Sequence, residues 1–209
     1  RYSSQMLSML ISSLYSLWFT DQITKKNPYT NHDISAFIIE KGFEGFSVQG
    51  HEMKMGIRGS STCSLYFDNC IVPKENLLGQ QGKGFKVAMT TLDGGRIGIG
   101  IAAQAIGIAQ GAINETVAYT KERVQFGKPI WKFQNTQFQL ADMQAKVDAA
   151  RLLVYRAAQA KQDGEPHSHL AAMAKLVASE TASDVARRCV QLVGGNGYSR
   201  EYPFERHMR

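Results

Sequence analysis

The chain has 209 residues, of which 44% are hydrophobic and 20% charged, a composition that excludes intrinsic disorder and predicts one large or two small folded domains. The net charge of +6 is spread along the chain, and its densest basic run, KERVQFGK, contains a glutamate, so nucleic acid is not an expected partner. Three cysteines without a C-x-x-C pair predict neither a disulfide framework nor a metal site, and we expect a reducing compartment.

The apolar segment MLSMLISSLYSLWF near the start is the candidate for a membrane or signal segment. It has 14 residues and is interrupted by serines, whereas a bilayer span needs about 20 apolar residues. No small-residue cleavage site follows it before Asp21 and Lys25. We therefore predict neither a membrane span nor a signal peptide.

The segment from Ile34 to Leu78 has the pattern of short β-strands. Three runs rich in β-branched and aromatic residues are separated by glycine-containing turns: ISAFIIE, GFSVQGHEM and SSTCSLYFDNCIV. The alternation of the third run breaks at Asp68 and Asn69, which predicts a turn or a bulge. The following VPKENLLGQQGKG is predicted to be a loop.

After Gly84 the apolar period becomes helical almost to the end of the chain. We predict helices over Lys83–Arg123, Phe133–Gln162 and Leu170–Val193, separated by the breaker segments GKPIW and DGEPHS. Spacings of three and four residues define the buried seams of the second and third helices, formed by Leu140, Met143, Val147, Ala150, Val154 and Ala157, and by Ala178, Ala182, Val185, Cys189 and Leu192. The third helix should end in a glycine-rich cap at GGNG.

These elements predict an α+β fold. Residues 1–80 would form a partial antiparallel β domain, and residues 81–209 most of an up-and-down four-helix bundle whose fourth helix is absent. The chain begins at Arg1 and ends at Arg209 without a polar tail, so we interpret it as a fragment of a longer protein.

Two short motifs resemble functional sites but have simpler interpretations. GIGIAA, Gly98–Ala103, matches a dinucleotide-binding fingerprint but follows no strand, so small residues at Gly94, Gly98, Ala102, Ala105 and Ala109 are expected to let a neighbouring backbone or a flat ligand approach. The His167 and His169 pair lies in a Gly/Pro loop without a third ligand. We predict no metal site, and the absence of a G-x-S-x-G motif disfavours a serine nucleophile.

From about Ile34 onward the chain resembles the acyl-CoA dehydrogenase family, most closely its short-chain or butyryl-CoA type. The motifs that carry the resemblance are, in order, ISAFIIEKGFEGFS, GIRGSST, LDGGRIGI, RVQFGKPIWKFQ and QLVGGNGYSREYPFERHMR. They correspond to the second half of the family's middle β domain and to most of its C-terminal helical domain. The resemblance implies FAD-dependent α,β-dehydrogenation of short-chain acyl-CoA thioesters to trans-2-enoyl-CoA. It also implies a homotetramer, a dimer of dimers, that passes electrons to an electron-transfer flavoprotein in the bacterial cytoplasm, or in the mitochondrial matrix of a eukaryote.

The resemblance also implies which residues bind FAD. Arg123, Phe126 and Gln134 match residues that contact FAD bound mainly by the neighbouring subunit. An arginine suits a pyrophosphate because its fork donates paired hydrogen bonds, although by itself Arg123 would also be favoured as a cation near a helix C-terminus. A second stretch matches residues that pack against the dinucleotide, and it is also the predicted helix cap: Gln191, Leu192, Val193, Gly194 and Gly195.

For the substrate, the resemblance points to the DGGR segment and to a tyrosine. Asp93, Gly94, Gly95 and Arg96 match the segment that lines the acyl-CoA pocket in short-chain members. Tyr198 would border the acyl cavity or serve as a packing residue.

No residue of this chain is expected to be the catalytic base. In most family members the base is a glutamate shortly after an R-D-A-K sequence, which would lie beyond Met208 and Arg209. The alternative family position, directly before the arginine equivalent to Arg96, holds Gly95 here. Glu201 and Glu205 are interpreted as surface or ion-pair residues. We therefore expect the fragment itself to be inactive.

Two departures from the family pattern keep other functions open. Residues 1–18 do not match the family, and GRIGIGIAAQA carries two more residues than its usual counterpart. Two residues rotate a helix by about 200°, so the helix must bulge or shift register there. The alternatives are an acyl-CoA oxidase or nitroalkane oxidase-like flavoenzyme, and a non-catalytic oligomerising scaffold.

Overall fold

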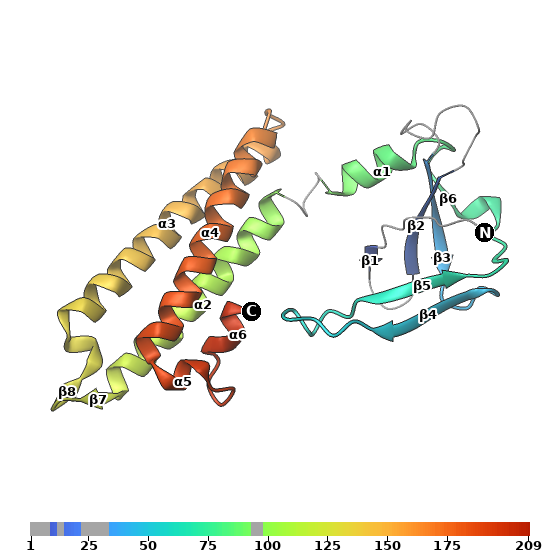
Figure 1. Ribbon diagram of the computed structural model, residues 1–209. Helices are drawn as coiled ribbons and strands as arrows, with labels where there is room; N and C mark the ends of the chain where they lie inside the picture. The colour runs from blue at the N-terminus through green and yellow to red at the C-terminus, as the bar shows by residue number, and fades with distance from the viewer. Residues whose placement is uncertain (1–8, 12–14, 22–33, 93–97) are drawn as a thin grey trace. The chain divides into compact units, whose positions relative to one another are not determined.

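The computed structural model describes residues 9–11, 15–21, 34–92 and 98–209, and the chain divides into two units, residues 1–94 and 95–209. The first unit contains mostly strands and the second mostly helices (Figure 1). The predicted α+β fold is therefore confirmed. Of residues 1–18, which depart from the family pattern, the description covers 9–11 and 15–18.

The first unit holds a four-stranded antiparallel sheet and a separate two-stranded ribbon. In the sheet, β1 (Met9–Ile11), β2 (Tyr15–Asp21), β3 (Ile34–Glu40) and β6 (Leu77–Leu78) follow the order β1-β2-β3-β6. The ribbon pairs β4 (Phe46–His51) with β5 (Cys63–Phe67). β3 coincides with the predicted ISAFIIE strand, and the predicted turn follows β5, where Asn69 has a φ of 50°.

The segment from Val72 to Gly84, predicted to be a loop, contains regular structure, so this prediction was partly wrong. It holds the 3-10 helix η1 (Lys74–Asn76) and the strand β6, whose residues pair with Ala36 and Phe37 of β3. The Asn76 side-chain amide also donates to the Ile38 carbonyl at 2.7 Å. Two residues are too few for an alternating pattern, which explains why the sequence does not reveal this strand.

The helix α1 (Gly84–Thr91) begins directly against the central strand β3. A Cβ atom added at Gly84 would lie 2.6 Å from the backbone carbonyl carbon of Ser35, so only glycine allows this approach. The Ser35 hydroxyl accepts a hydrogen bond from the Gly82 amide at 2.9 Å. These contacts fix the start of α1 on the sheet.

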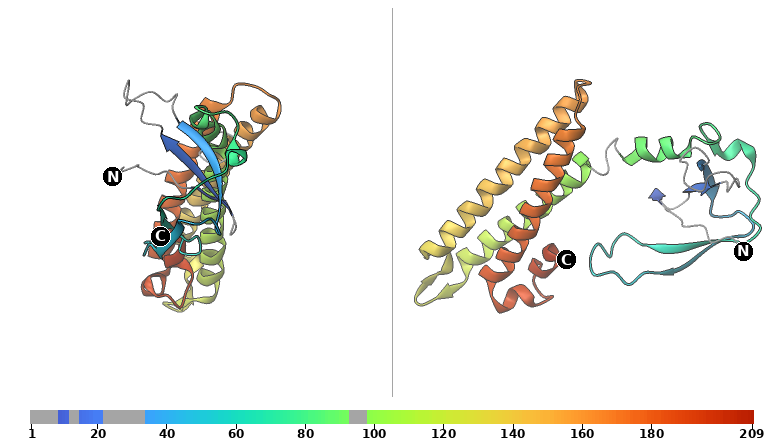
Figure 2. Two further views of the ribbon diagram at one scale, coloured as in Figure 1. Left: turned by 90° about the vertical axis from the view of Figure 1, so that its right-hand side faces the viewer. Right: turned by 45° about the horizontal axis from the view of Figure 1, so that its top comes forward.

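The second unit is a bundle of three long helices, α2 (Ile101–Glu122), α3 (Gln134–Gln162) and α4 (Ser168–Val193), which lie side by side in Figures 1 and 2. Two short helices follow, α5 (Gly195–Tyr198) and α6 (Phe204–Met208). Every residue of the two predicted seams is in the core, with only Leu140 and Leu192 partly rather than fully buried. The helix bounds at α3 and α4 agree with the prediction to within two residues.

The predicted continuous helix over Lys83–Arg123 corresponds to α1 and α2, and residues 93–97 between them lie outside the described residues. Leu92 and residues 98–100 are π-helical. A π-helical turn accommodates extra residues within a helix, as the expected bulge in GRIGIGIAAQA requires. Gly98 also makes the predicted close approach, since a Cβ added there would lie 2.7 Å from the Cβ of Ala171 in α4.

Two features are absent from the described residues, a candidate membrane span and a cluster of metal ligands. None of their helices is long and apolar enough to cross a membrane. They also contain no group of three or more His, Cys, Asp or Glu side chains that could hold a metal ion.

The contact at Gly98 can be tested with a pair of glycine substitutions. Gly98→Ala should lower the free energy of unfolding by about 1–3 kcal/mol, because the added methyl group overpacks the contact with Ala171. Gly107→Ala, in an exposed position of α2 with no atom within 4 Å of the added Cβ, should raise it by about 0.4–1 kcal/mol. Urea denaturation of the full chain measures both changes. A Gly98→Ala protein as stable as Gly107→Ala would contradict this packing.

Candidate functional site

A groove with a volume of about 640 Å³ lies where α2 ends, α3 begins and α4 ends. The end of α4 is far in the sequence from the other two segments, and all three meet at one end of the bundle, beside the labels β7, β8 and α5 in Figure 1. The lining residues are Tyr119, Arg123, Gln125, Phe126, Ile130, Phe133, Asn135, Thr136, Gln191, Leu192, Val193, Gly194, Gly195 and Asn196.

A short hairpin forms the first wall of the groove. The strands β7 (Val124–Gln125) and β8 (Lys128–Pro129) are joined by Phe126 and Gly127, whose φ angles are 52° and 77°. Two successive positive φ angles are typical of the type I′ turn, which favours Asn-Gly. An aromatic residue in the left-handed region costs about 1–3 kcal/mol, and the Phe126 side chain is nevertheless 92% exposed. The bundle thus holds an exposed aromatic ring at the rim of the groove at an energetic cost.

The start of α3 forms the second wall and is electropositive. Phe133 is the N-cap residue, and no side chain caps the helix, so its first amide groups keep their hydrogen-bonding capacity and the positive end of the helix dipole. Asn135 and Thr136 of this first turn line the groove together with Arg123. The Lys128 ammonium lies 4.4 Å from the centre of the Phe133 ring. A helix N-terminus with an adjacent arginine is a favourable site for an anion.

The end of α4 forms the third wall through a glycine corner. Gly194 has φ 68° and ψ −140°, a conformation essentially restricted to glycine, and its amide donates to the Gln191 carbonyl at 3.2 Å. The predicted glycine cap is therefore confirmed. The corner directs the chain into α5, where the Asn196 side-chain amide donates to the Tyr119 hydroxyl at 2.8 Å. This bond ties the corner to the last turn of α2.

Most of the predicted cofactor-binding residues meet in this one groove. Arg123, Phe126 and the whole stretch 191–195 line it. Gln134 is exposed and is not among the lining residues, although its neighbours Phe133 and Asn135 are.

The predicted substrate-binding residues are not part of this groove. Tyr198 is 87% exposed and is not a lining residue. Asp93, Gly94, Gly95 and Arg96 lie outside the described residues.

Several lining residues were not predicted from the sequence. Tyr119 lies one turn before Arg123 on α2 and its spacing could have suggested a shared face. Its ring also contacts the rings of Tyr202 and Phe204 edge-on, each at 5.8 Å between centroids. Asn196 follows the glycine corner, but nothing in the sequence pairs it with Tyr119.

Two ion pairs lie at the C-terminal helix α6. Glu205 of α6 pairs with Arg209, the residue that follows this helix, as expected for an ion-pair residue. Glu115 of α2 accepts a hydrogen bond from, or pairs with, His207 at 2.9 Å. Both carboxylates are therefore engaged in contacts at α6, and neither glutamate is a lining residue of the groove.

The glycine corner gives a matched pair of substitutions. Gly194→Ala should lower the free energy of unfolding by about 1–3 kcal/mol, because alanine is strained at this φ and ψ even though no atom lies within 4 Å of the added Cβ. Gly195→Ala should leave the free energy of unfolding nearly unchanged, because Gly195 has no positive φ and no atom lies within 4 Å of the added Cβ. Thermal unfolding of both proteins measures the difference. Equal stability of the two would show that the corner is not strained.

Comparison with known proteins identifies relatives of the chain. The family "Acyl-CoA dehydrogenase, C-terminal domain" matches residues 82–209. A short-chain specific acyl-CoA dehydrogenase of Megasphaera elsdenii is 56% identical over 86% of this chain and 46% of its own length. The corresponding enzyme of Clostridium acetobutylicum is 58% identical over 84% of this chain and 46% of its own length.

The solved structure of butyryl-CoA dehydrogenase from Megasphaera elsdenii is similar throughout, with a TM-score of 0.83 and 48% identity over 97% of this chain and 54% of that one. The chain spans about half the length of the curated relatives that it matches. Because the C-terminal domain matches more than half of its residues, the chain belongs to the acyl-CoA dehydrogenase family.

Proposed function

We propose that the protein is an FAD-dependent acyl-CoA dehydrogenase that converts short-chain acyl-CoA thioesters to trans-2-enoyl-CoA, and that this chain supplies part of its cofactor site. The observation that carries the proposal is the groove, which brings together Arg123, Phe126 and residues 191–195. Support for the substrate class comes from relatives named short-chain specific, including a mitochondrial enzyme of Rattus norvegicus at 49% identity.

FAD fits the chemistry of the groove. Its pyrophosphate would be held by the Arg123 guanidinium and by the uncapped start of α3, which together supply positive charge and free amide donors. The exposed Phe126 ring would cover a flat part of the cofactor, and the backbone of residues 191–195 would pack against the dinucleotide. Gln134 would contribute from the first residue of α3. A solved relative at 26% identity, PigA, is described with FAD bound.

The proposed reaction divides into tasks for the cofactor and for the protein. When bound, FAD would accept the hydride that leaves the β carbon of the acyl thioester. In our proposal Asp93, Arg96 and the intervening glycines bind and orient the thioester, and Tyr198 borders its acyl chain. We assign no residue of this chain as the base that removes the α proton. The domain organisation that we propose is a partial β domain over residues 1–80 and a helical domain over 81–209.

The proposed partners follow from the same site. The 92% exposure of Phe126 suggests that a second copy completes the groove, as a homotetramer built from dimers would allow. A chain that matches this one with a TM-score of 0.85 and 47% identity, covering 99% of this chain and 57% of that one, occurs in a solved structure described as concerning the electron transferring flavoprotein of Acidaminococcus fermentans. We propose an electron-transfer flavoprotein as the electron acceptor. The relatives come from bacteria and from a mitochondrion, so we propose the bacterial cytoplasm, or the mitochondrial matrix in a eukaryote.

The oxidase and scaffold alternatives make different predictions. An oxidase would reoxidise its reduced flavin rapidly in air, whereas a dehydrogenase would need the flavoprotein acceptor. A scaffold would be folded and colourless. The names of the relatives favour the dehydrogenase.

Arg123 provides the test of the cofactor groove. Arg123→Gln should weaken FAD binding roughly 10- to 100-fold, because a charge-assisted contact of about 1.5–3 kcal/mol is lost. Lys121→Gln, two residues earlier on α2 and outside the lining, should leave the affinity nearly unchanged. Quenching of FAD fluorescence on titration with the full chain measures both. If the unsubstituted chain binds no FAD, or if both variants weaken binding equally, the proposed role of the groove is wrong.

A further inference from the structure

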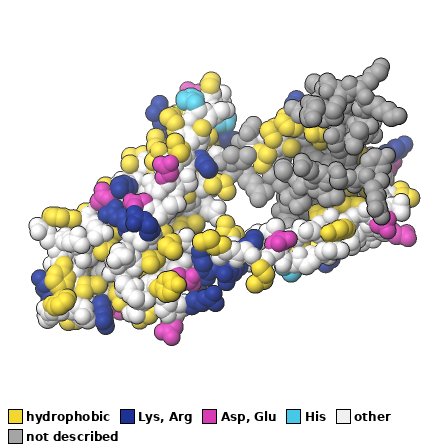
Figure 3. Space-filling view, viewed as in Figure 1, with side chains coloured by type: hydrophobic (Ala, Val, Ile, Leu, Met, Phe, Trp, Pro, Cys, Tyr) yellow, Lys and Arg dark blue, Asp and Glu magenta, His cyan; other side chains and the backbone are white. Residues whose placement is uncertain are grey.

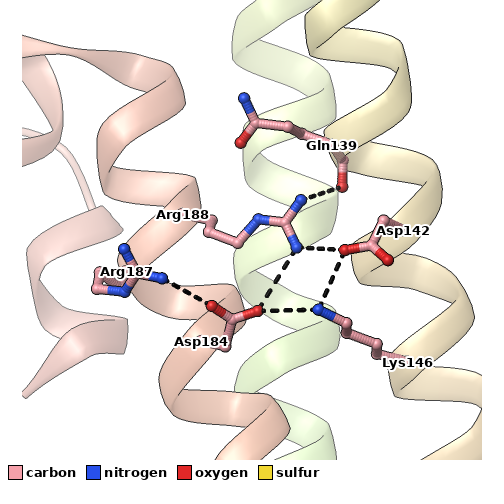
Figure 4. Close-up of polar contacts among 6 residues, drawn as sticks. All are labelled: Gln139, Asp142, Lys146, Asp184, Arg187 and Arg188. Carbon is pink, nitrogen blue, oxygen red and sulfur yellow. Dashed lines mark hydrogen bonds and ion pairs between the residues drawn. The ribbon is translucent and has the colours of Figure 1, made fainter.

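A network of charged side chains joins α3 to α4 (Figure 4). Arg188 of α4 donates to Asp142 of α3 at 2.5 Å and to the Gln139 carbonyl at 3.4 Å. It also pairs with Asp184, one turn earlier on α4, at 3.5 Å. Lys146 bridges the same two carboxylates, at 3.1 Å from Asp142 and 3.3 Å from Asp184. Arg188 therefore reaches two successive turns of α3.

Arg188 is the best shielded member of this network. Its side chain is 17% exposed, compared with 51% for Asp142 and 46% for Lys146. Exposed ion pairs contribute little to stability, but a shielded guanidinium that has two carboxylates and a carbonyl as partners is held in a defined geometry. Hydrogen bonds from Arg188 and then Lys146 lower the pKa of Asp142, as expected for a carboxylate that is stabilised by two cations. Charged groups of both signs lie side by side on the bundle face in Figure 3.

The network lies directly behind the groove. Gln191, a lining residue, follows Arg188 by three residues, which is the next turn of α4. Thr136, a lining residue of the opposite wall, precedes Gln139 by three residues, which is the adjacent turn of α3. Arg188 thus joins the first turns of α3 to the last turns of α4, and these are the segments that carry the two walls.

We propose that Arg188 is a positioning residue for the cofactor groove. It fixes the start of α3 against the end of α4, and so sets the spacing between the uncapped helix start and the glycine corner. Arg188 does not line the groove itself, so it acts through the backbone of the two walls. This inference rests on the proposed function, because it names a residue that shapes the proposed FAD site.

A second arginine provides a matched control. Arg151, farther along α3, pairs with Asp148 at 2.5 Å and donates to Gln110 of α2 at 2.8 Å. Its side chain is 30% exposed, and it also joins two helices through charged and amide partners. Arg151 differs from Arg188 in its distance from the groove, since it lies 15 residues after the lining residue Thr136 on α3, whereas Arg188 lies three residues before the lining residue Gln191 on α4. A role confined to bundle stability would be shared by both arginines.

The experiment compares Arg188→Met, Arg188→Lys and Arg151→Met in the full chain. Arg188→Met should weaken FAD binding roughly tenfold, the scale on which supporting residues alter a site. Arg188→Lys should restore most of the affinity, because it can still pair with Asp142. Arg151→Met should lower the melting temperature about as much as Arg188→Met does, but it should bind FAD with the affinity of the unsubstituted chain. In the absence of FAD, hydrogen exchange in peptides covering 133–140 and 189–196 should become faster only in Arg188→Met.

The outcomes separate this inference from the proposed function. If the unsubstituted chain binds no FAD, the proposed function fails, and the exchange rates of the two wall peptides still test the positioning role. Equal effects of Arg188→Met and Arg151→Met on the walls would overturn the inference. So would an Arg188→Met protein that folds with unchanged FAD affinity and unchanged exchange. If Arg188→Met does not fold, Asp142→Asn replaces it in the experiment, because Asp142 is a half-exposed partner of Arg188. This variant should show the same changes in FAD affinity and hydrogen exchange to a smaller degree. Unchanged hydrogen exchange in its two wall peptides would overturn the inference.

Discussion

The alanine-lined contact between α4 and its two neighbours is the constraint on which the rest of the helical unit depends. Ala102, Ala109 and Ala112 of α2, Ala150 and Ala157 of α3, and Ala174 and Ala178 of α4 are almost completely buried. Such small side chains let helix backbones approach closely but bury little apolar area each. The position of each helix is therefore set by backbone fit, and a single added methyl group at Gly98 would meet Ala171. This rigid seam determines where the ends of α2, α3 and α4 meet.

The groove at those ends is built from conformations that are unfavourable in isolation. Phe126 and Gly194 have positive φ angles on different walls, and the helix between them starts without a side-chain cap. Strained residues and free amide groups persist only where the surrounding packing fixes them. The alanine-lined seam can maintain these conformations, because it fixes the helix ends and so restricts the short segments that connect them. A site of this kind has donors in place before a ligand arrives, which lowers the cost of binding.

Sequence periodicity predicted the long helices well, since α3 and α4 are each anchored by a seam that repeats every three or four residues over many turns. It could not predict the β7–β8 hairpin, because two-residue strands have no period and Phe126-Gly127 lacks the usual Asn-Gly turn sequence. The groove residues came from the family resemblance, not from spacing. The bond between Asn196 and Tyr119 spans 77 residues, and no local pattern carries that information.

Tyr119 belongs to two parts of the molecule at once. Its hydroxyl accepts from Asn196 at the groove, while its ring is packed edge-on against Tyr202 and Phe204, the latter in α6. The groove and α6 therefore share one aromatic side chain. A change that displaced α6 would remove part of the packing that holds the Tyr119 hydroxyl beside Asn196.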